Sequence, residues 1–220
     1  MKHRVITTAD GSKTLYVPEM DEQYHSVNGA LTESEHVFLN NGYLHHPANP
    51  VSVFEVGFGT GLNALLTAIK ADELKRHTLF ASIEKHPLED KEVQELDYGK
   101  LFEIPVTNLF EKMHAAPWNE AVKISNFFTL YKVKADLTDF DFEENMYDVI
   151  YFDAFGPDKQ PKLWTPQIFN RLGSACRSGA IFVTYSAKGV VRRQLMNAGF
   201  IMERLPGPPG KRQMLRGSKV

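Results

Sequence analysis

The sequence predicts an α/β protein with a Rossmann-like fold, in which helices cover both faces of a seven-stranded, mostly parallel sheet. Three observations support this fold class. Apolar runs alternate with helical patterns from residue 51 onward, as they do in proteins built from βαβ units. A glycine-rich turn follows the first run, and the last two runs form a hairpin whose final strand is antiparallel. The predicted strands are residues 51–55, 78–83, 127–135, 147–152, 180–185, 200–205 and 213–216.

The helices between these strands are predicted from apolar periodicity and from residues typical of helix ends. Pro87 is placed in the first turn of its helix, a position that proline tolerates. Gly199 suits the end of the helix before the hairpin, because glycine adopts the left-handed conformation found there. The predicted helices are residues 61–74, 87–96, 165–176 and 187–197.

Composition indicates one soluble globular domain. The chain has 220 residues, of which 43% are hydrophobic and 24% are charged, values typical of globular proteins. A single cysteine, Cys176, excludes an internal disulfide framework and a cysteine-rich zinc site, and it fits a reducing cytoplasm. No apolar signal region or membrane-length apolar run is present, so we expect a cytoplasmic protein.

The first 50 residues are predicted to form an N-terminal extension that packs on the active-site side of the Rossmann-like domain, residues 51–220. The extension and the domain form one globular unit, because no linker or repeat separates them. Residues 14–17 are predicted as a short strand and residues 32–39 as a short helix. Thr32 and Glu35 have the spacing of a capping box at its start.

The glycine turn indicates a nucleotide-cofactor site. Glycines let the backbone turn sharply and let a ligand approach closely. The spacing Glu55-x-Gly-x-Gly-x-Gly61 differs from the dinucleotide fingerprint and from a phosphate-binding P-loop. An acid before the glycines attracts an ammonium or sulfonium group, and this pattern is typical of S-adenosylmethionine-dependent methyltransferases. A purely structural turn is the alternative. The predicted cofactor-binding residues here are Glu55, Gly57, Phe58, Gly59, Gly61 and Asn63.

Acidic residues also follow the next two predicted strands. Ligands of open α/β sheets bind beyond the carboxyl ends of the strands. Glu84 is placed to accept hydrogen bonds from both ribose hydroxyls of the cofactor, beside Lys85. Asp136 would accept the adenine amine, with Leu137 contributing its backbone; helix capping is the alternative role of Asp136. Glu55 would reach the methionine amino group, directly or through water.

The fourth strand ends at the candidate catalytic residue. Asp153 is placed where the transferred methyl group would lie, and its carboxylate can orient an amine or accept its proton. Phe155 and Trp164 could form a stacking wall for a flat substrate, although a core role suits Trp164 nearly as well. Ser186, after the fifth strand, is a further candidate for the pocket.

Charge is distributed unevenly along the chain. Residues 171–220 hold ten Lys or Arg and one acid, a net charge of +9, although the whole chain carries −2. This asymmetry suggests a polyanionic partner, with an ordinary solvated surface as the alternative. The eight histidines lack metal-ligand spacing, so no metal is expected.

Several motifs resemble the family of MnmC-type tRNA methyltransferase domains, called MnmD when they stand alone. The likeness runs from about residue 24 to 217, and residues 99–126 match poorly. Ala154-Phe155-Gly156 replaces the more common Gly-Phe-Ala order, and Ala135 stands where many relatives have glycine. Residues 28–38 resemble the family's N-terminal substrate-side segment. The motifs that carry the resemblance are residues 55–63, 84–88, 152–164, 184–193, 198–200 and 210–215.

The resemblance implies methylation of 5-aminomethyl-(2-thio)uridine at the wobble position of tRNA, with S-adenosylmethionine as the methyl donor. Asp153 would be the catalytic aspartate, and Phe155 and Trp164 would shape the base pocket. This chain shows no flavin-binding oxidase segment like that of bifunctional relatives, so another enzyme is expected to supply the aminomethyl group. The residues expected to hold the anticodon stem-loop by its phosphates are Lys188, Arg192, Arg193, Arg204, Lys211, Arg212 and Arg216.

Two other functions remain open from the sequence. The first is a methyltransferase of the same fold that acts on a small-molecule or protein amine, which would leave the basic C-terminal region unexplained. The second is a non-catalytic module that binds S-adenosylmethionine or RNA, for which the Asp153 carboxylate would be dispensable.

Overall fold

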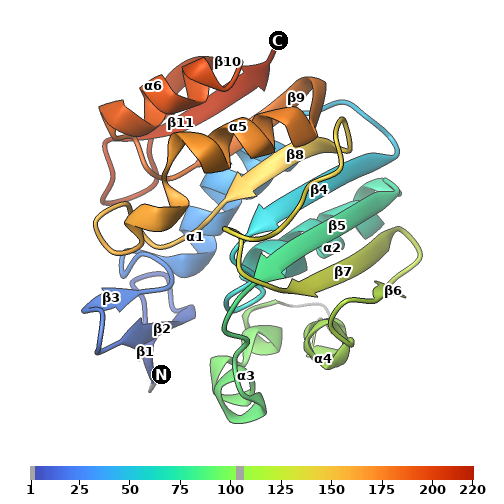
Figure 1. The fold of residues 1–220 in the computed structure, drawn as a ribbon. Coiled ribbons are helices and arrows are strands. Elements are labelled where there is room, and N and C mark those ends of the chain that lie inside the picture. Colours follow the sequence, from blue (N-terminus) through green and yellow to red (C-terminus); the bar gives the residue numbers. More distant parts are fainter. Residues whose placement is uncertain (1–2, 103–106) are drawn as a thin grey trace.

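A computed structural model describes residues 3–102 and 107–220, and an eight-stranded sheet forms its centre (Figure 1). The strand order is β10-β11-β9-β8-β4-β5-β7-β6. Neighbouring strands from β7 to β9 run parallel, whereas β11 is antiparallel to β9 and β10. The strands are β4 (Val51–Val56), β5 (Thr78–Glu84), β6 (Ala121–Lys123), β7 (Phe128–Lys134), β8 (Tyr147–Phe152), β9 (Cys176–Thr184), β10 (Phe200–Pro206) and β11 (Gln213–Lys219).

The predicted fold class and all seven predicted strands are therefore confirmed, with ends that differ by a few residues. The sequence analysis missed β6, a three-residue edge strand antiparallel to β7. It lies in the section that matched the family poorly, part of which, residues 103–106, falls outside the described residues. So short a strand gives no alternating pattern to detect.

Helices cover both faces of the sheet because successive strand side chains point to opposite sides. Val53 packs in the core that contains α2 (Leu62–Leu74) and α4 (Thr107–Ala115). Its neighbour Phe54 packs in the second core with α5 (Pro166–Ala175) and α6 (Gly189–Asn197). The carboxyl ends of the parallel strands remain open between these two layers (Figure 1).

Two predicted helix starts were wrong. The helix α3 spans Asp90–Leu96, so Pro87 precedes it, and Glu89 with Glu92 forms the capping box instead. The helix α1 spans Ala30–Ser34 and continues as a π-helical segment, η1 (Glu35–Tyr43). Thr32 does not cap it: its backbone N–H and hydroxyl donate to Asp10 Oδ2 at 2.9 and 2.8 Å. In contrast, Gly199 follows α6 with φ of 88°, as expected for its end.

The N-terminal residues form a separate three-stranded sheet, antiparallel throughout, in the order β1-β2-β3. The strands are β1 (Arg4–Thr7), β2 (Lys13–Val17), which includes the predicted strand at residues 14–17, and β3 (Glu22–Gln23). Residues that follow β2 and β3 reach the open edge of the large sheet. Met20, Tyr24 and His25 line a cavity there.

Candidate active site

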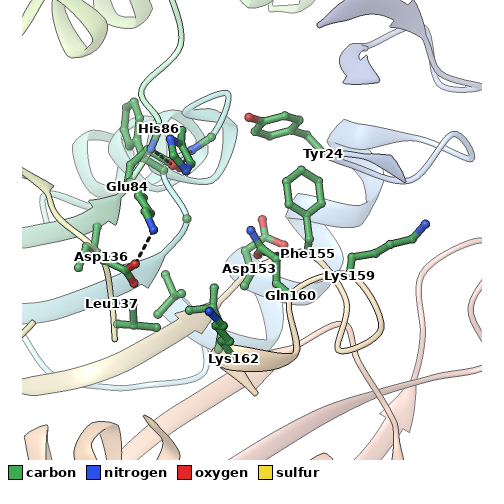
Figure 2. A pocket seen from close by; sticks show the side chains of 18 of the residues that line it. Tyr24, Glu84, His86, Asp136, Leu137, Asp153, Phe155, Lys159, Gln160 and Lys162 are labelled. Atoms are coloured by element: carbon green, nitrogen blue, oxygen red, sulfur yellow. Dashed lines mark hydrogen bonds and ion pairs between the residues drawn. The ribbon is translucent and has the colours of Figure 1, made fainter. Parts of the chain in front are cut away.

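A cavity of about 390 Å³ lies at the carboxyl ends of β4, β5, β7 and β8 (Figure 2). Its wall brings together ten of the residues that the sequence analysis proposed for cofactor or substrate binding. Side chains from the N-terminal segment and from the loop after β8 close it on the other side. The ten residues are Gly57, Phe58, Gly59, Asn63, Glu84, Lys85, Asp136, Leu137, Asp153 and Phe155.

The glycine turn forms one wall, and its geometry leaves no room for side chains. Gly57 and Gly59 have φ of 91° and 49°, in the region that L residues rarely adopt. A Cβ on Gly57 would lie 3.1 Å from the carbonyl oxygen of Asp153, and one on Gly59 would lie 2.9 Å from Tyr24 Cδ1. Gly61, with φ of 76°, precedes the first residue of α2 and lies outside the cavity lining.

Glu84 and Asp136 occupy the side of the cavity opposite Phe155 (Figure 2). Glu84 accepts the N–H groups of Gly59 (3.1 Å) and His86 (2.8 Å), and burial raises the pKa of its carboxyl. Asp136 pairs with Lys85 at 2.6 Å, and this contact lowers the pKa of Asp136 to about 2. No described helix starts at Asp136; its carboxylate instead accepts the N–H of Thr138 at 2.9 Å.

Glu55 is fully buried and does not line the cavity. Ser82 Oγ donates to its Oε2 at 2.6 Å, whereas its Oε1 has no hydrogen-bond partner among the described residues. Burial raises the pKa of Glu55 to about 8, so this carboxyl group is largely protonated at neutral pH. The residue expected to touch the methionine amino group thus lies behind the wall formed by its neighbours.

Asp153 lines the cavity together with the glycine turn and Phe155. Asn63, in the first turn of α2, donates from Nδ2 to Asp153 Oδ2 at 2.8 Å. Burial raises the pKa of Asp153 well above its ordinary value; the nearby carboxyl groups of Glu33 and Glu55 act in the same direction, and Asn63 and Lys211 act in the opposite direction. A raised pKa makes the ionised form of a carboxyl group a stronger base.

Aromatic residues from two distant segments meet above Asp153 (Figure 2). The rings of Tyr24 and Phe155 pack edge to face with centroids 5.0 Å apart. Lys159, from the loop after β8, joins the same two segments, because its Nζ donates to the carbonyl oxygen of Met20 at 2.6 Å. Sequence reasoning missed Tyr24 and Met20, because no motif marks a residue that reaches the site only through folding.

Trp164 and Ser186 lie behind the cavity rather than in its lining. Trp164 is 5% exposed and packs on Phe152, with ring centroids 4.7 Å apart, so its position favours the core role. Its Nε1 nevertheless donates to the carbonyl of Phe155 at 2.8 Å and thereby holds the loop that bears this ring. Ser186 is 6% exposed.

The proposed phosphate-binding residues fall into two groups, and none of them lines the cavity. Lys188 pairs with Asp158, Lys211 with the buried Glu33, and Arg216 with Glu203. Within the part of the chain that the structure describes, four of them have no ion pair. These are Arg192, Arg193, Arg204 and Arg212.

Residues 3–102 and 107–220 hold no group of three or more His, Cys, Asp or Glu side chains arranged to hold a metal ion. Among them, too, there is no helix with the length and apolar character needed to cross a bilayer.

The strand order, the antiparallel last strand and the glycine turn facing two acids define a methyltransferase of the Rossmann-like class. Residues 105–220 match the sequence profile of the S-adenosyl-L-methionine-dependent methyltransferase family, and the chain belongs to this family. Its cofactor is therefore S-adenosyl-L-methionine. The residues present fit that group: Gly57 and Gly59 line the cavity where an added Cβ would meet neighbouring atoms, and the buried Oδ1 of Asn63, which also lines the cavity, lacks a partner among the described residues.

Two proteins with similar sequences are longer than this chain and are named as bifunctional proteins. The chain is 33% identical over 215 residues to the tRNA 5-methylaminomethyl-2-thiouridine biosynthesis bifunctional protein MnmC of Nitrosospira multiformis, covering 92% of this chain and 35% of that protein. It is 35% identical over 213 residues to the protein of the same name from Cupriavidus necator, covering 90% and 32%. The chain thus spans about a third of the length of these relatives.

Solved structures agree with the fold. The crystal structure of MnmC2 from Aquifex aeolicus superposes with a TM-score of 0.79 at 25% identity, covering 99% of this chain and 70% of that one. Spermidine synthase from Thermotoga maritima matches with a TM-score of 0.60 at 16% identity, covering 100% and 75%, and shows the likeness of fold alone.

Proposed function

We propose that the protein transfers a methyl group to the exocyclic amine of 5-aminomethyl-(2-thio)uridine at the wobble position of tRNA. The observation that carries the proposal is the position of the Asp153 carboxylate. It accepts a hydrogen bond from Asn63 at 2.8 Å and lies between the glycine turn and the aromatic pair of Tyr24 and Phe155. The names of the relatives, which refer to 5-methylaminomethyl-2-thiouridine in tRNA, support this choice of amine.

The cofactor supplies an electrophilic methyl group when it is bound. Glu84 would hold the ribose hydroxyls, since its carboxylate lines the cavity beside the glycine turn. Asp136 and the backbone of Leu137 would hold the adenine. Gly57 and Gly59 would let the ligand approach the backbone closely.

Asp153 would orient the substrate amine and accept a proton from it, so that the nitrogen lone pair faces the methyl group. Phe155 and Tyr24 offer ring surfaces on which the flipped-out uracil could stack. Anticodon-loop bases are already single-stranded, so turning one into the cavity costs only a few kcal/mol. The cationic residues Arg192, Arg193, Arg204 and Arg212 would contact the RNA phosphates.

The expected substrate already carries its aminomethyl group. A separate enzyme, or a further part of the same protein, would supply it. The cytoplasm, where tRNA is modified, is the expected compartment.

The test is methyl transfer from labelled cofactor to tRNA taken from a strain that lacks this enzyme, followed by nucleoside analysis. The expected product is labelled 5-methylaminomethyl-(2-thio)uridine. Spermidine and a lysine-rich peptide serve as competing amines. Label in either of them, with none in the tRNA, would replace this proposal with a small-molecule or protein methyltransferase.

A further inference from the structure

A partly buried ion pair joins the N-terminal segment to the C-terminal hairpin close to Asp153. Glu33, in α1, is 4% exposed, and its Oε1 contacts the Nζ of Lys211, which lies between β10 and β11. Its Oε2 accepts the N–H of Ser26 at 2.8 Å. Both oxygens of the carboxylate are therefore engaged by groups that belong to different ends of the chain.

The same lysine continues into a chain of contacts that ends beside the candidate catalytic residue. Lys211 Nζ lies 4.0 Å from the centroid of the Tyr185 ring, over its face. The hydroxyl of Tyr185 donates to the carbonyl of Ala154 at 2.8 Å. Ala154 directly follows Asp153 in the chain. A cation over an aromatic face holds that ring in place, so Lys211 fixes the group that anchors the backbone next to Asp153.

Stability alone gives little reason to keep such a pair. Removing a charge from water costs several kcal/mol, and Glu33 is almost fully buried, whereas the side chain of Lys211 is 31% exposed. Solvent therefore weakens the attraction between the two charges, and the pair stabilises the protein little. The sequence analysis placed Lys211 among the phosphate contacts, but its ammonium group is engaged by Glu33 and Tyr185.

We propose that Glu33 and Lys211 form a positioning pair for Asp153, and that Lys211 acts through Tyr185 on the backbone of Ala154. The inference rests on the proposed function for its activity readout. The pair thereby fixes the position from which the Asp153 carboxylate would orient the substrate amine.

Glu33 and Lys211 also act on Asp153 through their charges. The charge of Glu33 raises the pKa of Asp153, and the charge of Lys211 lowers it. Loss of Lys211 alone leaves a buried, uncompensated carboxylate near Asp153, a more harmful state than loss of both charges. The double substitution should therefore be less damaging than Lys211→Met alone.

The experiment compares Lys211→Met, Glu33→Gln, the double variant and Lys211→Arg in methyl transfer to tRNA. We expect Lys211→Met to lower kcat about 10- to 100-fold, the range expected when a catalytic group is misplaced, with the KM for tRNA changed less than threefold. The double variant should recover part of this loss, and Lys211→Arg should recover most of it. Binding of S-adenosylhomocysteine should stay within about threefold of wild type in every variant.

Lys219→Met is the matched control. Lys219 also lies near the face of an aromatic ring, 5.7 Å from the centroid of Phe200, on the adjoining strand β11, but it has no contact with the Tyr185 chain. The Lys219→Met variant should leave kcat unchanged. A raised KM for tRNA with normal kcat in Lys211→Met would overturn the proposal in favour of a phosphate contact. Losses that multiply in the double variant would overturn it too.

A wild-type protein that methylates no tRNA would refute the proposed function and not this pair. Hydrogen exchange then decides: the amides of residues 153–156 should exchange faster in Lys211→Met than in wild type or Lys219→Met. Equal exchange in all three proteins would refute the positioning role.

Discussion

The two sides of the cavity are built in different ways. On the side proposed to bind the cofactor, Gly57 and Gly59 follow β4, Glu84 ends β5 and Asp136 follows β7, and these three strands are parallel neighbours. On the substrate side, Tyr24 meets Phe155 from a position 131 residues earlier in the chain. The first side depends on backbone geometry close to the strands, and the second depends on the docking of distant segments.

This difference predicts different consequences of mutation. Changes on the cofactor side should act on ligand affinity, because the glycine turn and the acids are the groups proposed to contact the ligand. Changes on the substrate side should act on turnover, because they move an amine relative to the methyl group. The following predictions test that division.

Asp153→Asn should have the largest effect. It keeps the side-chain size but removes the proton-accepting carboxylate, so the rate of methyl transfer should fall about 10²- to 10⁴-fold, the usual share of general base catalysis. Calorimetry should show S-adenosylhomocysteine binding within a few-fold of wild type. A rate within twofold of wild type would remove Asp153 from its catalytic role.

Gly59→Ala should weaken cofactor binding by about 10- to 100-fold, since its Cβ would lie 2.9 Å from Tyr24 Cδ1 at a φ of 49°. Gly179→Ala is the matched control: its φ is 81°, but nothing lies within 4 Å of its Cβ. It carries the strain without the contact, so it should lower stability slightly and leave the Kd unchanged. Similar Kd values for the two variants would show that the close approach at Gly59 does not matter.

The sequence predicted which residues meet on this side of the cavity because the signals that mark them are local. A glycine turn after an apolar strand and acids at the next strand ends occupy the same edge of any parallel sheet. Tyr24, Met20 and the Glu33–Lys211 pair have no such signal, because they reach the site through contacts between chain ends. The sequence marked Glu55 as a candidate cofactor-binding residue. It could not show that Glu55 is fully buried behind the cavity wall, since burial depends on the packing of other segments around it.

Glu55→Gln should raise stability in a pH-dependent way. The pKa of Glu55 is about 8 in the folded protein, against the value of 4.5 for an unburied glutamate, as in the unfolded chain. Between these two values the unfolded chain loses the proton and the folded chain keeps it, so the free energy of unfolding falls as pH rises. The neutral amide avoids this loss.

Thermal unfolding should therefore show little difference between variant and wild type near pH 4.5. The advantage of the variant should grow to a few kcal/mol by pH 8, on the scale of about 1.4 kcal/mol per pKa unit, and level off above it. A constant difference across the pH range would mean that Glu55 is charged in the folded protein.

Substitution of both Arg192 and Arg193 by Ala should have the smallest effect, because neither residue lines the cavity. Each lost phosphate contact lowers the slope of log K against log salt by about one, so the pair should lower it by about two. At moderate salt, tRNA affinity should fall several-fold, with kcat at saturating tRNA unchanged. Lys70→Gln, on the opposite face of the sheet in α2, is the control and should leave the slope as it is. If the slope of the arginine variant also stays as it is, the RNA lies elsewhere, and the positive charge of α6 is an ordinary solvated surface.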